Sequence, residues 1–270
     1  MSSHVDLRVN DTFLAWLNSK YGKYGEVKGL QAKYHDFLGI KIDFCSKKHL
    51  ILDMRKYVRN MLDDFPIKFG KDDTLPTPAT NNLLEAGNGK PLFKAWKEQF
   101  YSIVAKGLSL TKRTRPDVHI VIAILSTRAK EPTESDWAKL VQVMKYLHST
   151  WLFTLTITAE DILVIKWTVD ASSAVHPDFK SHTGGTLHFG GILMGSIVSL
   201  SRKQKLNTKS STEAELVAAN DISSLILWTQ LFMEEQGYPI ERNLLYQDNK
   251  SAILLEQNGK KSSSKRTRQT

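Results

Sequence analysis

Apolar residues recur at helical spacing in some stretches of this chain and alternate with polar residues in others. Over residues 1–68 this pattern predicts two helices and three strands. The helices are expected at 11–21 and from 53 to 66, and the strands at 26–30, 36–44 and 49–52. Proline, asparagine and glycine residues between 69 and 90 indicate a connector without regular structure.

Helical spacing dominates residues 91–150, whereas the rest of the chain returns to strands. There the pattern predicts strands at 162–170, 186–189, 194–201 and 244–247, with helices at 211–222, from 225 to a stop at Gly237, and at 251–257. The order β-β-β-α-α-β-α is typical of a mixed sheet packed against helices. We therefore predict an α/β chain in three parts, residues 1–68, 69–156 and 157–270.

Several tryptophans and a histidine lie on apolar faces of the expected helices. The tryptophans are predicted to be core residues, and they are Trp16, Trp96, Trp137 and Trp228. His119 lies within an apolar run and is assigned a structural role.

Two aspartates stand at the ends of predicted strands in the last third of the chain. Asp170 closes the strand at 162–170, and Asp248 follows the strand at 244–247. Strand ends in α/β sheets are common places for functional sites. An aspartate there can equally serve as a turn or helix N-cap residue, so that alternative stays open for each one taken alone.

Glu215 shares a helix face with the apolar residues Ala218 and Ile222. Its spacing from Thr212 also fits a capping box, so a capping role stays open. A carboxylate on a buried stripe is costly unless a cation or hydrogen bonds compensate it, and two nearby aspartates would add repulsion. Oxygen ligands of this kind suit Mg²⁺ or Mn²⁺, and a pair of such ions drives attack of water on a phosphodiester.

Charge and cysteine content narrow the function classes further. The chain has 37 Lys+Arg against 28 Asp+Glu, a formal net charge of +9, which favours a polyanionic partner. Cys45 is the single cysteine, so an intrachain disulfide is excluded and a reducing compartment is indicated. The sequence shows neither a run of about 18 apolar residues nor a signal-peptide pattern. We therefore expect an intracellular protein, cytoplasmic or nuclear, without a membrane partner or a transmembrane segment.

Short blocks of sequence stand in a fixed order through the last third of the chain. They are 168–170 (Thr-Val-Asp), 180–185 (Lys-Ser-His-Thr-Gly-Gly), 199–204 (Ser-Leu-Ser-Arg-Lys-Gln), 210–216 (Ser-Ser-Thr-Glu-Ala-Glu-Leu) and 247–252 (Gln-Asp-Asn-Lys-Ser-Ala). This ordered set resembles the ribonuclease H domain of copia-type (pseudovirus) retrotransposon Pol polyproteins. Upstream, the blocks at 115–117 and 146–150 are similar to the segment that links polymerase and ribonuclease H in that family, and 34–40 to a strand near the end of the polymerase palm.

The resemblance implies a fold and a function for each part. Residues 1–68 would be the end of the palm, 69–156 a thumb- or connection-like helical segment, and 157–270 a ribonuclease H-like mixed sheet flanked by helices. Asp170, Glu215 and Asp248 would be the catalytic residues and would hold two Mg²⁺ ions, for which Mn²⁺ can substitute. The implied reaction is hydrolysis of the RNA strand of an RNA–DNA hybrid.

Basic residues are the expected contacts with such a hybrid, because its backbone and shape are recognised more than its base sequence. The candidates are Lys180, Arg202, Lys203, Lys265, Arg266 and Arg268. For the last three a solvated tail without a binding role is the alternative.

Two departures from the family pattern bear on activity. The polymerase signature Tyr-Val-Asp-Asp is absent from this sequence, so this chain alone is not expected to polymerise DNA. The fourth metal-site aspartate of the family pattern would follow Thr270. The alternatives to an active nuclease are a catalytically inactive remnant that at most binds nucleic acid and a host-adopted interaction module.

Overall fold

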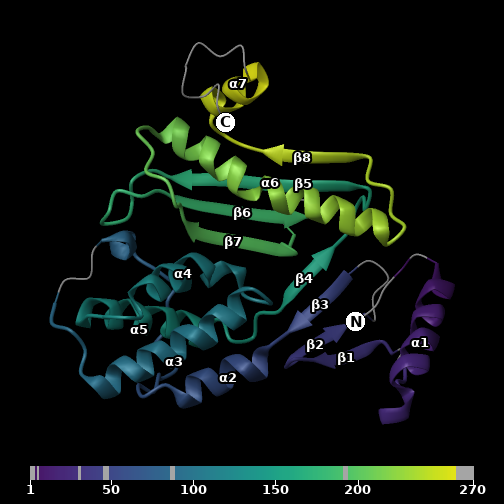
Figure 1. The fold of residues 1–270 in the computed structure, drawn as a ribbon. Coiled ribbons are helices and arrows are strands. Elements are labelled where there is room, and N and C mark those ends of the chain that lie inside the picture. Colours follow the sequence, from purple (N-terminus) through teal and green to yellow (C-terminus); the bar gives the residue numbers. More distant parts are fainter. Residues whose placement is uncertain are drawn as a thin grey trace.

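A computed structural model describes residue 4 and residues 6–29, 32–44, 49–85, 89–190 and 194–259. Within these residues the chain forms two four-stranded sheets and seven α-helices (Figure 1). The predicted α/β class is confirmed. The first helix, α1 (Leu7–Tyr21), buries none of its residues.

The first sheet is antiparallel throughout and joins segments that are far apart in the sequence. Its order is β1 (Tyr34–Phe37), β2 (Ile40–Asp43), β3 (His49–Asp53) and β4 (Leu155–Thr158). The stretch at 36–44, predicted as one strand, is a hairpin whose turn holds Leu38 and Gly39 at φ values of 51° and 79°. Positive φ at both central residues is the geometry of a tight two-residue turn, and Gly39 adopts it without strain. Residues 26–29, expected to begin a strand, have no regular structure.

The helical segment builds its own apolar core. It consists of α2 (Arg55–Asp64), α3 (Lys94–Thr111), α4 (His119–Arg128) and α5 (Glu134–Ser149), with short 3₁₀ helices at Asn81–Leu84 and Pro116–Val118. Val58, Phe100 and Leu140 are fully buried in this core. Helices α3 and α4 approach closely at Gly107, where an added Cβ would lie 2.8 Å from the Ile122 side chain. The helical prediction for residues 91–150 is therefore confirmed.

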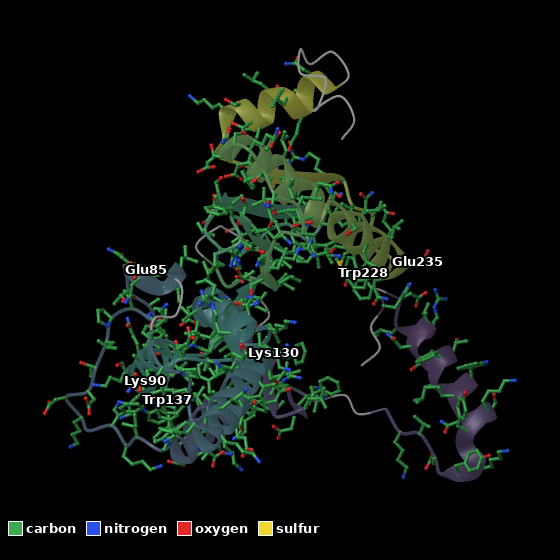
Figure 2. All side chains as sticks on the ribbon, turned by 60° about the vertical axis from the view of Figure 1, so that its left-hand side comes forward. Glu85, Lys90, Lys130, Trp137, Trp228 and Glu235 are labelled. Atoms are coloured by element: carbon green, nitrogen blue, oxygen red, sulfur yellow. The ribbon has the colours of Figure 1, made fainter. Side chains whose placement is uncertain are left out.

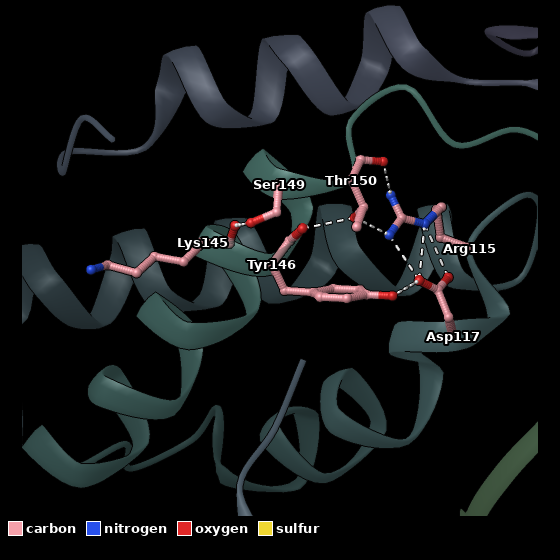
Figure 3. A network of polar contacts seen from close by, with 6 residues as sticks. All are labelled: Arg115, Asp117, Lys145, Tyr146, Ser149 and Thr150. Carbon is pink, nitrogen blue, oxygen red and sulfur yellow. Dashed lines mark hydrogen bonds and ion pairs between the residues drawn. The ribbon is translucent and has the colours of Figure 1, made fainter. Parts of the chain in front are cut away.

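The sequence blocks at 115–117 and 146–150 meet in one polar network (Figure 3). The side chain of Arg115 is 2% exposed, and its guanidinium donates to Asp117 at 2.8 Å and to the Thr150 hydroxyl at 2.6 Å. The Tyr146 hydroxyl donates to the same carboxylate at 2.9 Å. The network ties the turn before α4 to the end of α5, so these residues hold the helical segment together.

The second sheet has the order β7-β6-β5-β8 and mixes strand directions. Strands β5 (Val164–Ser172), β6 (His182–His188) and β7 (Val198–Lys203) are antiparallel neighbours, and β8 (Arg242–Tyr246) runs parallel to β5. Helix α6 (Ser211–Glu235) crosses one face of the sheet, and α7 (Lys250–Asn258) follows β8 (Figure 1). Ala218 and Ile222 of α6 belong to the same buried cluster as Trp167 and Val169 of β5.

The structure also corrects details of the predicted elements in this region. Two helices were predicted where α6 is continuous, because no glycine or proline interrupts residues 211–235. The strands predicted at 186–189 and 194–201, with a hairpin turn expected at Gly190 and Gly191, correspond to the antiparallel neighbours β6 and β7, and β6 already ends at His188. Gly191, the other residue of the predicted turn, lies outside the described residues.

Helix α6 is long and apolar enough, by length and composition alone, to cross a membrane, and 28% of its most apolar stretch is buried. Core helices of soluble proteins have the same property, and the first half of α6 packs on the sheet. Figure 2 shows Trp228 and Glu235 toward the other end of the helix, away from α7. The intracellular location stays a prediction.

The core assignment of the tryptophans is wrong for three of them. The exposed fractions of Trp16, Trp96 and Trp228 are 49%, 41% and 59%. Trp137 is half-buried and packs against the helical core. Helical spacing identifies an apolar face, but whether another element covers that face depends on tertiary packing.

The two sheets are joined where β4 leads into β5. Ala159 forms a bridge with Phe189, and α4 packs on β7, where His119 Nδ1 lies 2.6 Å from the Ser199 hydroxyl. The boundary predicted between residues 156 and 157 falls inside β4, which pairs with β3. The division into three domains stays a prediction.

Candidate metal centre

Asp170 and Asp248 come together because β5 and β8 are parallel neighbours. Their last register pair is Thr168 with Tyr246, and each aspartate lies two residues beyond that pair. The carboxyl ends of parallel strands open to the same edge of a sheet, which is where sites are commonly built. Both aspartates are exposed at this edge, so an ion and a substrate have access to them.

Glu215 reaches the same edge from α6. Ser210 caps the helix, and its hydroxyl accepts a hydrogen bond from the backbone N–H of Glu213 at 3.2 Å. Glu215 therefore lies early in the helix, on the side that continues into the buried residues Ala218 and Ile222. The predicted position of Glu215 on the buried stripe is confirmed.

Neighbouring residues take the capping roles that were left open for these acids. The Glu213 carboxylate accepts from the backbone N–H of Lys209 at 2.7 Å. Asn249 caps α7 by accepting from the backbone N–H of Ala252 at 3.0 Å. Capping therefore does not explain why Glu215 or Asp248 is acidic.

The three acids form a tight group. Asp170, Glu215 and Asp248 each present a carboxylate oxygen, and these three oxygens lie within 4.8 Å of one another. In the described part of the chain, this is the one group of three or more histidine, cysteine or acidic side chains close enough to share an ion. The structure thus brings together all three residues predicted as catalytic, whereas their role in catalysis and metal binding stays a prediction.

Electrostatics single out Glu215 within this group. Burial raises the pKa of its carboxyl above the ordinary value, while the Gln247 side chain and the Ala171 backbone lower it; the charges of Asp170 and Asp248 raise it further. Its Oε2 atom is buried without a hydrogen-bond partner. A buried carboxylate with one oxygen unpartnered and two other carboxylates nearby is unfavourable without a counter-charge.

A divalent cation fits these residues. It would provide the partner that Glu215 Oε2 lacks, and it would offset the repulsion among the three acids. Hard cations such as Mg²⁺ and Mn²⁺ prefer carboxylate oxygens, and the exposed side of the group leaves coordination positions for water and substrate. The donor set therefore favours magnesium or manganese.

The basic residues predicted to contact nucleic acid are paired with acids where the structure describes them. Lys203 Nζ lies 2.7 Å from the Asp178 carboxylate, and Lys180 Nζ lies 4.0 Å from the same group. Arg202 contacts Asp221 at 3.1 Å. The remaining three candidates, Lys265, Arg266 and Arg268, lie outside the described residues.

A buried polar network beside the site was not predicted from the sequence. The side-chain amide of Gln204, which is 1% exposed, donates to the Thr183 hydroxyl at 3.1 Å and to the Ala214 carbonyl at 2.8 Å. Thr183 in turn donates to Asp221 at 3.1 Å. Because Ala214 directly precedes Glu215, Gln204 ties the end of β7 to the helical turn that carries the buried acid.

Known proteins similar to this chain point to one family. The chain is 28% identical over 253 residues, 91% of its length, to the retrovirus-related Pol polyprotein from transposon TNT 1-94 of Nicotiana tabacum. It is also 28% identical over 222 residues, 82% of its length, to the Pol polyprotein from transposon RE2 of Arabidopsis thaliana. The chain spans 18% and 15% of these two polyproteins, so it corresponds to a small part of each. No family model matches the chain.

Two further similarities are of a different kind. The secreted RxLR effector protein 161 of Plasmopara viticola is 31% identical over 130 residues, which are 48% of this chain and 89% of that protein. A foamy viral protease-reverse transcriptase, solved in complex with double-stranded DNA, covers 89% of this chain and 35% of its own with a TM-score of 0.44 and 11% identity. The matches to the transposon polyproteins run through most of the chain. Over most of its length the chain is therefore similar to a part of the copia-type retrotransposon Pol polyproteins.

Proposed function

We propose that this chain hydrolyses the RNA strand of an RNA–DNA hybrid in a reaction that depends on two divalent metal ions. The observation that carries the proposal is the meeting of three carboxylates from three separate segments, with Glu215 buried and unpaired at Oε2. The family and the net charge of +9 favour a nucleic-acid substrate over a small molecule.

The protein's own contribution is to hold three carboxylates in fixed positions. Asp170 and Asp248 sit at the exposed edge of the sheet, so they can bind cations while the outer side of the site receives the phosphodiester. Glu215 closes the site from the α6 side and is kept in place by the packing of that helix. When bound, the ions supply Lewis-acid activation of the attacking water and neutralise charge on the phosphodiester.

A cleavage assay tests the proposal with the full chain. A labelled RNA–DNA hybrid is incubated with the protein and Mg²⁺ or Mn²⁺, and we expect cleavage confined to the RNA strand. Glu215→Gln should lower the rate by about a hundredfold or more, because it removes a charged ligand on which the ions depend. Glu235→Gln, the same change at the exposed far end of the same helix, is the matched control and should keep the wild-type rate.

The other outcomes also have a definite meaning. Cleavage that survives both Asp170→Asn and Glu215→Gln would contradict a catalytic role for this centre. Salt-sensitive binding of the hybrid without cleavage by the wild-type chain would favour the inactive remnant. Failure to bind any nucleic acid would favour the interaction module.

A further inference from the structure

The hairpin tip between β5 and β6 lies close to the three acids. Strand β5 continues for two residues beyond Asp170 and ends at Ser172, where the chain leaves the sheet. At about 3.3 Å per residue, the tip begins roughly 7 Å from Asp170 along the strand. It returns to the sheet at His182, which pairs with Ser172. Whatever occupies the metal centre is therefore within reach of residues 173–181.

Phe179 stands out in this tip in two respects. Its side chain is 74% exposed, although it is a large apolar ring. Its φ is +58°, a left-handed conformation that is unfavourable for a bulky residue and is usually left to glycine or asparagine. Neither property helps the fold, since the ring buries little surface and the backbone is strained. Strain of this kind is found at binding sites, where the surrounding structure holds it.

Hydrogen bonds fix the backbone on both sides of Phe179. The Phe179 N–H donates to the His176 carbonyl at 2.8 Å, and the His176 N–H donates to the Lys180 carbonyl at 3.1 Å. The His176 ring lies 3.1 Å, Nε2 to Nδ1, from the buried His182 ring. The tip therefore cannot relax easily into a conformation that would fold the Phe179 ring back onto the protein.

The end of the tip is fixed as well. Ser181 is fully buried, and its hydroxyl accepts from the Ala174 backbone N–H at 3.1 Å and lies 2.8 Å from the Thr208 hydroxyl. Asp178, next to Phe179, is anchored to Lys203 at 2.7 Å. The neighbours of Phe179 are thus held by the protein, while its own ring is presented to solvent.

Charge at the tip is largely balanced. Asp178 lies close to both Lys180 and Lys203, so this acid offsets part of the positive charge next to the exposed ring. A contact made by this tip would therefore draw on apolar and stacking interactions more than on attraction to phosphates. The A-like minor groove of a hybrid is wide and shallow, and it exposes sugars and base edges to which a protruding ring can pack.

We infer that Phe179 is a nucleic-acid contact that packs its ring against the sugars or bases of the hybrid held at the metal centre. This inference rests on the proposed function, because it requires a hybrid at Asp170, Glu215 and Asp248. It assigns the tip an interaction that is insensitive to salt, in contrast to contacts between basic side chains and phosphates.

Binding measurements on the full chain separate these contributions. The affinity for a fluorescent RNA–DNA hybrid is measured by anisotropy over a series of salt concentrations, in chelator so that cleavage does not interfere. Phe179→Ala should weaken binding roughly fivefold or more, the loss of about one stacking contact, and Phe179→Trp should restore it. The slope of log affinity against log salt should stay unchanged in both variants, because no phosphate contact is lost.

Phe93→Ala is the matched control. Phe93 is another strongly exposed phenylalanine, but it precedes α3 in the helical segment. This variant should bind like the wild type. Equal affinities of Phe179→Ala and Phe93→Ala would overturn the inference, and so would a changed salt slope in Phe179→Ala.

The two proposals fail in distinguishable ways. If the wild-type chain cleaves and binds the hybrid while Phe179→Ala is unaffected, the inference is wrong and the proposed function stands. If the wild-type chain does not bind the hybrid at all, both are wrong. A melting temperature for each variant shows whether it is folded.

Discussion

The Glu215 carboxylate should have opposite effects on the metal-free fold and on metal binding. It is 5% exposed, its Oε2 lacks a hydrogen-bond partner, and burial raises its pKa. A raised pKa of an acid means that the charged form is disfavoured in the folded state, so at neutral pH this group destabilises the fold. Glu215→Gln removes the charge and places an amide donor beside two carboxylates. We expect the metal-free variant to be about 1–2 kcal/mol more stable than the wild type.

Thermal unfolding with and without Mn²⁺ checks both effects. Mn²⁺ should raise the Tm of the wild type, because it binds the folded state, and should have little effect on Glu215→Gln. Glu235→Gln should behave like the wild type in both conditions. A metal-free Glu215→Gln variant that melts well below the wild type would mean that the contacts with Gln247 and Ala171 outweigh the cost of burial and repulsion.

His182 should make the stability of the chain depend on pH. Burial above all, together with the charges of His176 and His119, lowers its pKa to about 4. The unfolded state then binds the proton more tightly, so stability is full above about pH 6.5 and is lost as the pH falls toward 4. The loss from this group alone is about 3 kcal/mol. Its surroundings include Lys203, Arg128 and Asp178, whose charges act on the neighbouring ring of His176.

Urea unfolding between pH 7.5 and pH 4.5 measures this dependence. The range starts above the ordinary histidine pKa of about 6.5 and approaches the pKa of about 4 of His182 in the folded chain. His182→Gln should make the dependence shallower, since a glutamine keeps a polar partner for Ser201 without taking up a proton. His49→Gln, at an exposed position of β3, is the control and should leave the wild-type dependence intact. Parallel curves for the wild type and His182→Gln would show that His182 is not the titrating group.

Residue-level reasoning from the sequence located the three acids but missed two other side chains. Asp170 and Asp248 follow local strand patterns and Glu215 lies on a local helical stripe, which made them candidates, while the resemblance to a known family implied their common site. Gln204 matters because its amide reaches another element, and Phe179 because of its backbone conformation. Neither a contact with another element nor a backbone conformation can be recognised from the spacing of residue types in the sequence.

At the scale of elements, the join between β7 and α6 sets the position of Glu215. Gln204 donates to the carbonyl of Ala214, one residue before Glu215, and also to Thr183 on β6. Residues that orient metal ligands commonly cost 10–100-fold in metal affinity when they are changed. We expect Gln204→Leu to weaken Mn²⁺ binding by about tenfold and to lower stability by about 1–3 kcal/mol.

Calorimetric titration with Mn²⁺ separates positioning from simple destabilisation. Gln230→Leu removes an amide of the same type from the other end of α6, where it bonds to Glu234, and should leave the Mn²⁺ affinity unchanged. If Gln204→Leu is folded at the titration temperature and binds Mn²⁺ as tightly as the wild type does, the role of Gln204 is structural only.

The differences between predicted and observed elements have local physical causes. One predicted strand became the β1–β2 hairpin because Leu38 and Gly39 adopt positive φ, which apolar alternation does not reveal. Two predicted helices are one helix, α6, because neither Ser223 nor Ser224, which lie between the two predicted ranges, ends a helix as glycine or proline would. Element type was predicted well, and element boundaries were not.

At the scale of the whole molecule, long-range pairing escaped the sequence pattern. Strand β4 completes the first sheet by pairing with β3, although most of the helical segment lies between them in the chain. Likewise, the order β7-β6-β5-β8 is what places Asp248 beside Asp170. Periodicity names the strands, but their partners depend on the packing of the complete chain.

The exposed face of the second half of α6 leads to a prediction about the behaviour of the whole chain in solution. An apolar patch is formed there by Leu227, Trp228, Leu231 and Phe232, whose exposed fractions are all above 40%, and the Trp228 and Phe232 rings are stacked at 5.2 Å. Contiguous exposed apolar surface promotes association, whereas single exposed apolar residues do not. We expect the purified chain to self-associate with increasing concentration and Leu227→Lys/Leu231→Lys to be monomeric, with a Tm close to that of the wild type.

Light scattering at several concentrations tests the role of this patch against that of charge alone. The control, Leu206→Lys/Leu254→Lys, adds the same two charges at exposed leucines outside the patch. Because both double variants gain the same net charge, general electrostatic repulsion would reduce association equally in the two. A monomeric control, or a patch variant that still associates, would therefore contradict the prediction, while loss of association in the patch variant alone would locate the contact on the second half of α6.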